Sequence, residues 1–111
     1  MSRLPAYQAM LGRRGLERKK GLAAKWTLEM ELLLHALQPA CVVCGRDDRL
    51  TVDHVRPLSK GFGLEPGNAV ILCKSCNSRK RTRSLEDLPI RMAMAILAAA
   101  GDFKILWDHR A

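Results

Sequence analysis

The chain has 111 residues, with 48% apolar side chains and a net charge of +8 from 19 Lys and Arg against 11 Asp and Glu. This length fits one domain with a small core, and the apolar content favours a folded protein over a disordered one. The positive charge suits a polyanionic partner such as nucleic acid, although a solvated basic surface has the same composition. Two Trp, two Phe and one Tyr argue against a platform that stacks several bases.

Two features that the sequence lacks bear on where the protein works. The longest apolar stretch runs from Met92 to Ala100, well short of the roughly 18 residues of a transmembrane helix. The N-terminal sequence, MSRLPAYQAMLGRRG, lacks the apolar stretch of a secretion signal. We therefore expect a protein without membrane contact in a reducing cytoplasm, where disulfides rarely persist.

A basic arm and an amphipathic helix are predicted first along the chain. Residues 1–25 are rich in Lys and Arg and are interrupted by glycines, which predicts an arm that either is a solvated tail or contacts DNA. Residues 27–38, TLEMELLLHALQ, repeat leucine at the period of an amphipathic helix. Thr27 can cap the start of this helix, and Pro39 ends it.

Two strands and a basic helix are predicted in the middle of the chain. Residues 50–56, LTVDHVR, are rich in β-branched side chains and predict a strand that Pro57 ends. A loop rich in glycine follows, and residues 69–72, AVIL, predict a second short strand. From Cys73 the sequence CKSCNSRKRTR turns polar and basic, and we expect it to be helical.

A last helix, nearly continuously apolar, is predicted over about 89–100. Ser84 and Asp87 have the spacing of a capping box ahead of it. Pro89 suits its first turn, and Gly101 is the expected C-terminal cap. Because the helix is apolar nearly all round, we expect it to be buried in the core or against a partner.

Four cysteines in two Cys-x-x-Cys pairs give the strongest chemical signal in the chain. Cys41 and Cys44 form one pair, Cys73 and Cys76 form the other, and there is no further cysteine. Two such pairs can complete a closed tetrahedral shell around one Zn²⁺, which predicts a structural zinc rather than a catalytic one. Gly45 fits the tight turn after the first pair. A redox motif would need only one pair, and two disulfides conflict with the expected compartment.

A group of polar residues lies between and just after the cysteine pairs. Asp53 supplies a carboxylate and Asn77 an amide oxygen, and Mg²⁺ and Mn²⁺ prefer oxygen ligands of this kind. His54 follows Asp53 on a predicted strand, so the two side chains leave on opposite faces and a base need not bind the metal. Taken alone, an Asp-His pair is equally typical of local hydrogen bonds at the end of a strand.

The order of these features resembles the HNH endonuclease family in its four-cysteine zinc variant. The segments CVVCG, LTVDHVRPLSKG and NAVILCKSCNSRK carry the resemblance. It implies an α+β fold, in which a small ββα-metal motif (the His-Me finger) is stapled by zinc and flanked by helices. We therefore expect a nuclease domain over residues 26–111 with its zinc and ββα-metal core at 41–83, in a protein of bacterial or phage origin.

The resemblance also implies roles for single residues. His54 would be the general base, Asp53 a ligand of the catalytic metal, and Asn68 the residue that orients the loop beside His54. Asn77 stands where many members have His and would be the second metal ligand. Arg81 stands where some relatives have a further His. Water and the scissile phosphate would then complete the shell, which suits Mg²⁺ or Mn²⁺.

The implied function is metal-dependent hydrolysis of DNA phosphodiester bonds, which leaves 5′-phosphate and 3′-hydroxyl ends. Contacts to DNA phosphates are expected from the basic residues around the site, Lys60, Arg79, Lys80, Arg81 and Arg83. Two alternatives stay open: a zinc-containing module that binds nucleic acid without cleaving it, and a protein whose nuclease site is degenerate. The Asp53-His54 pair favours the nuclease, because a mere binding module has no need of it. The sequence predicts no particular oligomeric state.

Overall fold

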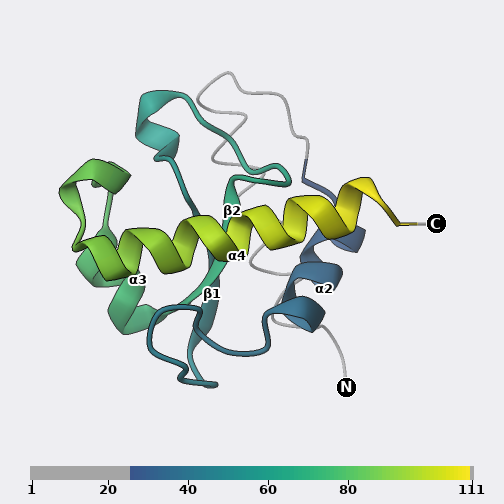
Figure 1. Cartoon of the computed structure of the whole chain (residues 1–111), viewed down its shortest axis with the longest axis horizontal. Coiled ribbons are helices and arrows are strands. Elements are labelled where there is room, and N and C mark those ends of the chain that lie inside the picture. The colour runs from purple at the N-terminus through teal and green to yellow at the C-terminus, as the bar shows by residue number, and fades with distance from the viewer. Residues whose placement is uncertain (1–25, 111) are drawn as a thin grey trace.

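The computed structural model describes residues 26–110 and has an α+β fold (Figure 1). Along the chain come α2 (Leu28–Leu37), β1 (Leu50–His54), the 3₁₀ turn η1 (Leu58–Lys60), β2 (Ala69–Cys73), α3 (Lys74–Lys80), the 3₁₀ turn η2 (Leu85–Asp87) and α4 (Ile90–Asp108). The predicted fold class is thereby confirmed, with β1, β2 and α3 in the expected ββα order and helices on either side. The basic arm predicted for residues 1–25 lies outside the described residues.

The two strands form one antiparallel sheet, in which Leu50 pairs with Cys73 and His54 pairs with Ala69. This register places the side chain of Asp53 on the same face as Val70, and that of His54 on the opposite face with Ala69. All five residues of β2 are buried. Its continuously apolar sequence is therefore explained by cover on both faces of the strand.

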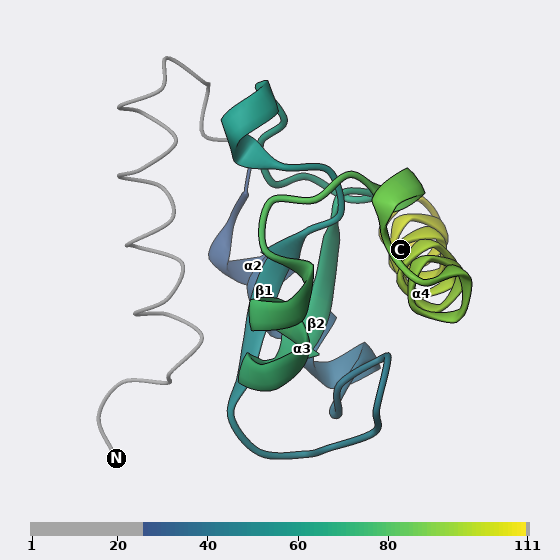
Figure 2. The ribbon, with the colours of Figure 1, turned by 90° about the vertical axis from the view of Figure 1, so that its left-hand side faces the viewer.

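The helices pack around this sheet so that each face has its own core cluster. Figure 2 shows α3 against the strands and α4 beside β2. Val70 and Leu72 pack with the cysteines and with α4 residues such as Ile96, whereas Ile71 packs with Trp26 and others in a second cluster. The short sheet is held by these two clusters, because an isolated pair of strands is marginally stable in water.

Helix α2 forms where its leucine spacing and its capping residue predict it. The Thr27 hydroxyl accepts a hydrogen bond from the Met30 backbone N–H at 3.2 Å, which confirms it as the N-terminal cap. At the other end, the buried Gln38 amide accepts from the Ile71 backbone N–H and donates to the Ala99 carbonyl. One side chain therefore joins the end of α2 to both β2 and α4.

The predicted end of the last helix was wrong. Helix α4 continues through Gly101 to Asp108, where Gly101 was expected to end it. Phe103 is fully buried, and its ring centroid lies 5.9 Å from that of Trp26. Burying such a ring stabilises by about 1.5–3 kcal/mol, which exceeds the cost of about 1 kcal/mol for a glycine inside a helix. Tertiary packing thus outweighs the local signal.

The surroundings of α4 agree only in part with the prediction of a helix buried in the core or against a partner. One face of the helix is buried, whereas the apolar side chains of Ile90, Met94, Leu97 and Ile105 are exposed. The predicted capping box does not form: Ser84 makes no side-chain capping bond, and its hydroxyl instead accepts a hydrogen bond from Lys60 Nζ. Within residues 26–110, no helix combines the length and apolar character needed to cross a membrane.

Candidate active site and metal centre

The four cysteines converge on one point. Two of them precede β1, and the other two lie at the junction of β2 and α3. Their Sγ atoms all lie within 4.8 Å of one another, and none forms a disulfide. Cys41, Cys73 and Cys76 are buried, while Cys44 is exposed. A tetrahedral zinc with Zn–S bonds of about 2.3 Å requires sulfurs roughly 3.8 Å apart. The chemistry and spacing of this cluster therefore fit a zinc ion.

The local backbone explains how the two cysteine pairs close. Gly45 adopts a positive φ of 82°, as expected for the turn after the first pair, and its N–H donates to the Cys41 carbonyl at 2.9 Å. On the other side, Cys73 ends β2 and its sulfur accepts a hydrogen bond from the Cys76 backbone N–H. The start of α3 is thus fixed to the cysteine cluster.

The sulfur environments pull the cysteine pKa values in opposite directions. Burial raises the pKa of Cys41, but backbone N–H groups of Cys44, Cys73 and Val43 outweigh burial and lower it to about 6. The backbone N–H of Cys76 lowers the pKa of Cys73. Burial raises the pKa of Cys76 to about 12, in spite of a hydrogen bond from Arg79. The protein alone therefore favours the thiolate at two of the four ligand positions.

Asp53 and His54 border one cavity of about 240 Å³ at the end of β1. Its other walls come from the loop after β1 and from the end of α3, with Pro57, Leu58, Ser59, Lys80, Arg81 and Thr82. Asp53 and His54 lie on opposite faces of the sheet by register, yet both line this cavity at the end of β1. A carboxylate and an imidazole therefore meet at one opening, beside two basic residues of α3 and its C-terminal turn.

Lys80 differs from its sequence prediction. It was expected to face solvent and contact phosphate, but its side chain is only 1% exposed, and its Nζ lies 3.3 Å from Asp53 Oδ2. The Asp53 side chain is itself only 15% exposed. In this structure Lys80 is thus the cationic partner of the carboxylate that was predicted to hold a metal.

Asn68 joins the end of β1 to the loop that follows it. Its Oδ1 accepts a hydrogen bond from the Arg56 backbone N–H at 2.8 Å, and its Nδ2 donates to the Gly63 carbonyl at 2.9 Å. Its own carbonyl accepts from the Val55 N–H at 3.1 Å. These bonds hold the backbone immediately after His54, which is the position at which a residue could orient His54.

Asn77 lies on α3, about one helical turn before Lys80. It is half-buried and lines a wider cavity of about 580 Å³ with Arg49, Leu50, Thr51 and Lys74. Thr51 and Asp53 share one face of β1, so Asn77 and Asp53 lie beside the same side of the strand. Asp53 and Asn77 line different cavities, and their joint role as metal ligands stays a prediction.

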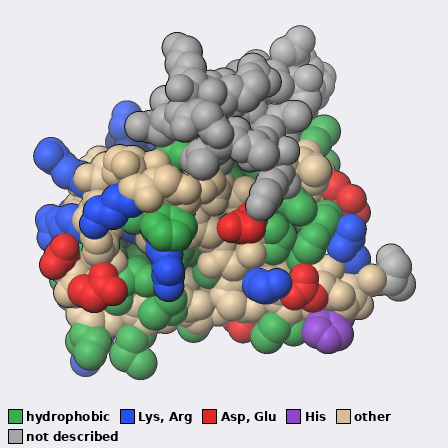
Figure 3. All heavy atoms as spheres, turned by 90° about the horizontal axis from the view of Figure 1, so that it is seen from above, with side chains coloured by type: hydrophobic (Ala, Val, Ile, Leu, Met, Phe, Trp, Pro, Cys, Tyr) green, Lys and Arg blue, Asp and Glu red, His purple; other side chains and the backbone are tan. Residues whose placement is uncertain are grey.

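The other predicted DNA-contacting residues have different surroundings. Arg81 and Arg83 are exposed, and Lys60 is exposed on η1. Arg79 is exposed, but its Nη2 donates to Cys76 Sγ at 3.1 Å, so it contacts the cysteine cluster. Figure 3 shows Lys and Arg side chains gathered at the left end of the molecule, the end at which Figure 1 places α3 and both 3₁₀ turns.

Comparison with known families shows which family the segment containing the cysteine cluster and the Asp53–His54 pair is similar to. Residues 41–83 match the family model described as HNH endonuclease. Residues 41–83 are thus similar to the HNH endonuclease family. The match includes both cysteine pairs, Asp53, His54, Asn68 and Asn77, and it confirms the resemblance that the sequence motifs indicated.

Whole-chain comparisons add one structural likeness. A search of curated proteins gives no match. Among solved structures, the Type IV phosphorothioation-dependent restriction endonuclease ScoMcrA is similar at 19% sequence identity with a TM-score of 0.47. The likeness covers 90% of this chain but only 25% of that protein.

The structure of the segment that matches the family model also reveals features that the sequence interpretation missed. Cys76 and Lys80 are four residues apart on α3 and are both buried, so they occupy one face of the helix. The four-residue spacing from Cys76 could therefore have predicted that the Lys80 side chain is buried. Arg81 has a φ of 51° and a ψ of −131°, which is a conformation that glycine normally occupies, and no sequence signal indicated this.

Proposed function

We propose that this chain is a metal-dependent DNA endonuclease whose reaction takes place in the cavity between β1 and the end of α3. The observation that carries the proposal is that Asp53 and His54 both line that cavity. Both residues lie in the segment that matches the HNH endonuclease family model. An acid–base group beside a ligand for a hard cation is the pairing that hydrolysis of a phosphodiester needs.

His54 acts as the general base in this proposal. The neutral imidazole takes a proton from a water molecule, the water oxygen attacks phosphorus, and the bond from phosphorus to the 3′-oxygen breaks. The leaving 3′-oxygen takes a proton from solvent, which leaves a 5′-phosphate and a 3′-hydroxyl. The Asn68 hydrogen bonds keep the chain next to His54 in place, so Asn68 is a positioning residue.

The donor set beside His54 suits a hard divalent cation. Asp53 and Asn77 would hold Mg²⁺ or Mn²⁺, which would neutralise the charge that develops on the phosphate oxygens. Lys80 already places one positive charge beside Asp53, and a metal ion at this carboxylate would have to displace it. Arg81 lines this opening, Arg83 is exposed two residues later, and both supply contacts to phosphates without base selection.

The cysteine cluster has a separate, structural role in this proposal. Cys41, Cys44, Cys73 and Cys76 bind one Zn²⁺, and four thiolates leave no open position for substrate. This zinc fixes the start of α3 and thereby the positions of Asn77 and Lys80. Residues 26–111 make up the nuclease domain, with residues 1–25 as a basic arm.

Cleavage of supercoiled plasmid by Asp53→Ala and Asn77→Ala proteins tests this assignment. We expect Asp53→Ala to lose more activity than Asn77→Ala, because a carboxylate offsets metal charge and an amide does not. Ser78→Ala, at an exposed position on α3, is the matched control and should cleave like the unaltered protein. Full metal-dependent activity of Asp53→Ala would refute the assignment. DNA binding without cleavage by the unaltered protein would favour the zinc-containing binding module instead.

A further inference from the structure

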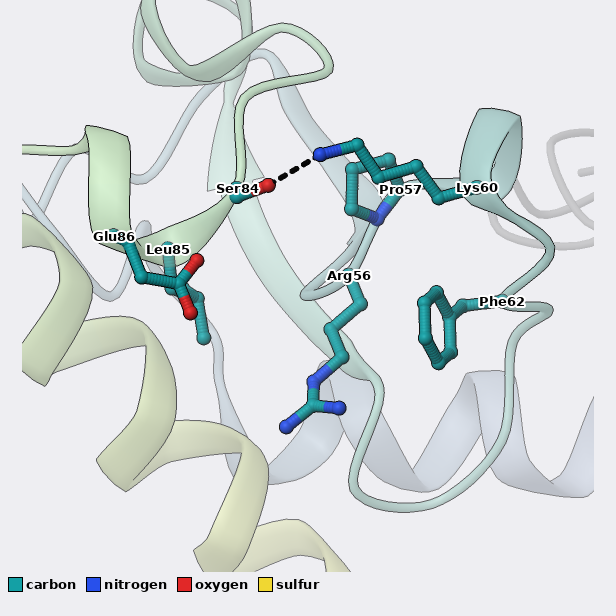
Figure 4. Close-up of a pocket in the computed structure, with 7 residues that line it drawn as sticks. All are labelled: Arg56, Pro57, Lys60, Phe62, Ser84, Leu85 and Glu86. Atoms are coloured by element: carbon teal, nitrogen blue, oxygen red, sulfur yellow. Dashed lines mark hydrogen bonds between the residues drawn. The ribbon is translucent and has the colours of Figure 1, made fainter.

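A second cavity adjoins the proposed catalytic one. It measures about 230 Å³ and is lined by Arg56, Pro57, Lys60, Phe62, Ser84, Leu85 and Glu86 (Figure 4). Pro57 also borders the Asp53–His54 cavity, so the two hollows share a wall. If the scissile phosphate of a DNA strand lies at His54, a nucleotide next to the cleaved bond would therefore lie at this second cavity.

Phe62 gives this cavity an exposed aromatic face. Its side chain is 41% exposed, whereas the other aromatic side chains within residues 26–110 are buried or half-buried. The Arg56 guanidinium lies over the Phe62 ring, 5.6 Å from its centroid. Aromatic rings are surfaces on which proteins stack nucleic-acid bases. The Phe62 ring thus offers a stacking surface for a single base, and the neighbouring Arg56 is left to donate hydrogen bonds to the edge of that base.

Polar groups surround this stacking surface on two sides. Lys60 Nζ donates to Ser84 Oγ, which connects η1 to the segment before η2 and closes one side of the cavity. In Figure 4, Arg56 extends between Phe62 on one side and the Leu85–Glu86 segment on the other. Hydrogen-bond donors of Arg56 and an acceptor carboxylate of Glu86 therefore border the same small space.

We propose that this cavity binds one base of the cleaved DNA strand, next to the scissile phosphate, and that it prefers guanine. Arg56 would donate to O6 and N7 of guanine, and Glu86 would accept from its N1–H and 2-amino group. A cavity of about 230 Å³ lies below the roughly 300–1,000 Å³ of pockets for drug-sized ligands, so it suits one planar base. The inference rests on the proposed nuclease function and adds a base preference to it.

Sequencing the ends produced from a substrate of random sequence tests this preference. Guanine should be enriched about fivefold or more at one fixed position beside the cut, as expected for one recognised base. Phe62→Leu and Glu86→Gln should each reduce this enrichment while cleavage continues. Arg91→Gln, which removes a charge from the exposed side of α4, should leave the enrichment unchanged. An even base distribution beside the cuts of the unaltered protein would overturn the proposal.

A binding measurement separates this inference from the nuclease function itself. Titration of ¹⁵N-labelled His54→Ala protein with guanosine 5′-monophosphate should shift the backbone amide signals of Gly61, Phe62 and Gly63. Cytidine 5′-monophosphate should shift them less, and Phe62→Leu should weaken the response to both. If the protein cleaves no DNA but responds in this way, the nuclease proposal fails and the base site stands. Equal or absent responses to both nucleotides would contradict the base site.

Discussion

The Nζ atom of Lys80 lies 3.3 Å from Oδ2 of Asp53, at the wall of the cavity that His54 also borders. The lysine side chain is almost completely buried, so its ammonium group has left bulk water for this contact. A buried ammonium is stable only when it is paired. Lys80 therefore holds the Asp53 carboxylate in place, and it would compete with any metal ion that binds the same carboxylate.

Replacing Lys80 by Met tests this competition. The substitution keeps the length of the side chain and removes its charge. We expect Mn²⁺ to bind the zinc-loaded protein about tenfold more tightly by titration calorimetry, which corresponds to about 1.4 kcal/mol. Without Mn²⁺ the free energy of unfolding should fall by about 3 kcal/mol, because one partner of a buried ion pair is lost.

Lys60→Met is the matched control for this prediction, since Lys60 is exposed and lies outside the Asp53–His54 cavity. It should leave Mn²⁺ affinity unchanged and alter stability by less than about 1 kcal/mol. Weaker Mn²⁺ binding by Lys80→Met would show that Lys80 supports the metal rather than competes with it.

Removal of the zinc should unfold the domain. Structural zinc sites contribute apparent binding free energies of about 10–16 kcal/mol, comparable to the entire stability of a small domain. After treatment with a strong chelator, we expect the thermal unfolding transition seen by circular dichroism to disappear and to return when Zn²⁺ is added. Elemental analysis of the native protein should give one zinc per chain. A protein that melts at the same temperature with and without chelator would contradict this role.

Arg81→Gly should stabilise the fold although it removes a charge. Arg81 follows α3 with φ 51° and ψ −131°, and such backbone strain costs a non-glycine residue about 1–3 kcal/mol. We expect a gain of about 1 kcal/mol in urea denaturation, together with weaker binding of duplex DNA. Arg83→Gly is the control, because Arg83 carries the same charge at a residue whose φ is not positive. If both substitutions destabilise the protein equally, the strain is not relieved at Arg81.

The sequence predicted those parts of the fold that local signals determine. The Thr27 cap and leucine spacing define α2, and β-branched residues define β1. The cysteine pairs could be placed together because a metal site requires their convergence. The end of α4 could not be predicted, because the contact between Phe103 and Trp26 joins residues far apart in the sequence. Lys80 was taken for a surface residue because it lies within a run of basic side chains.

Gly101 offers a test of whether α4 is helical past its expected end. A Cβ at this position would meet no atom within 4 Å, and the residue is helical. Gly101→Ala should therefore stabilise the protein by about 1 kcal/mol, which is the helix-propensity difference. Gly45→Ala meets equally open space but has a φ of 82°, so it should destabilise the protein. Urea denaturation of both variants measures the contrast, and a loss of stability in Gly101→Ala would refute the explanation.

The most direct test is the conversion of supercoiled plasmid by purified, zinc-loaded protein with Mg²⁺, with Mn²⁺ and with EDTA, alongside the His54→Ala variant. The unaltered protein should nick or linearise the plasmid only with a divalent ion. His54→Ala should be slower by about 10²- to 10⁴-fold, as is typical when a general base is lost, with zinc content and DNA binding unchanged. Cleavage by His54→Ala at the rate of the unaltered protein, or the absence of cleavage with either metal, would contradict a nuclease centred on His54.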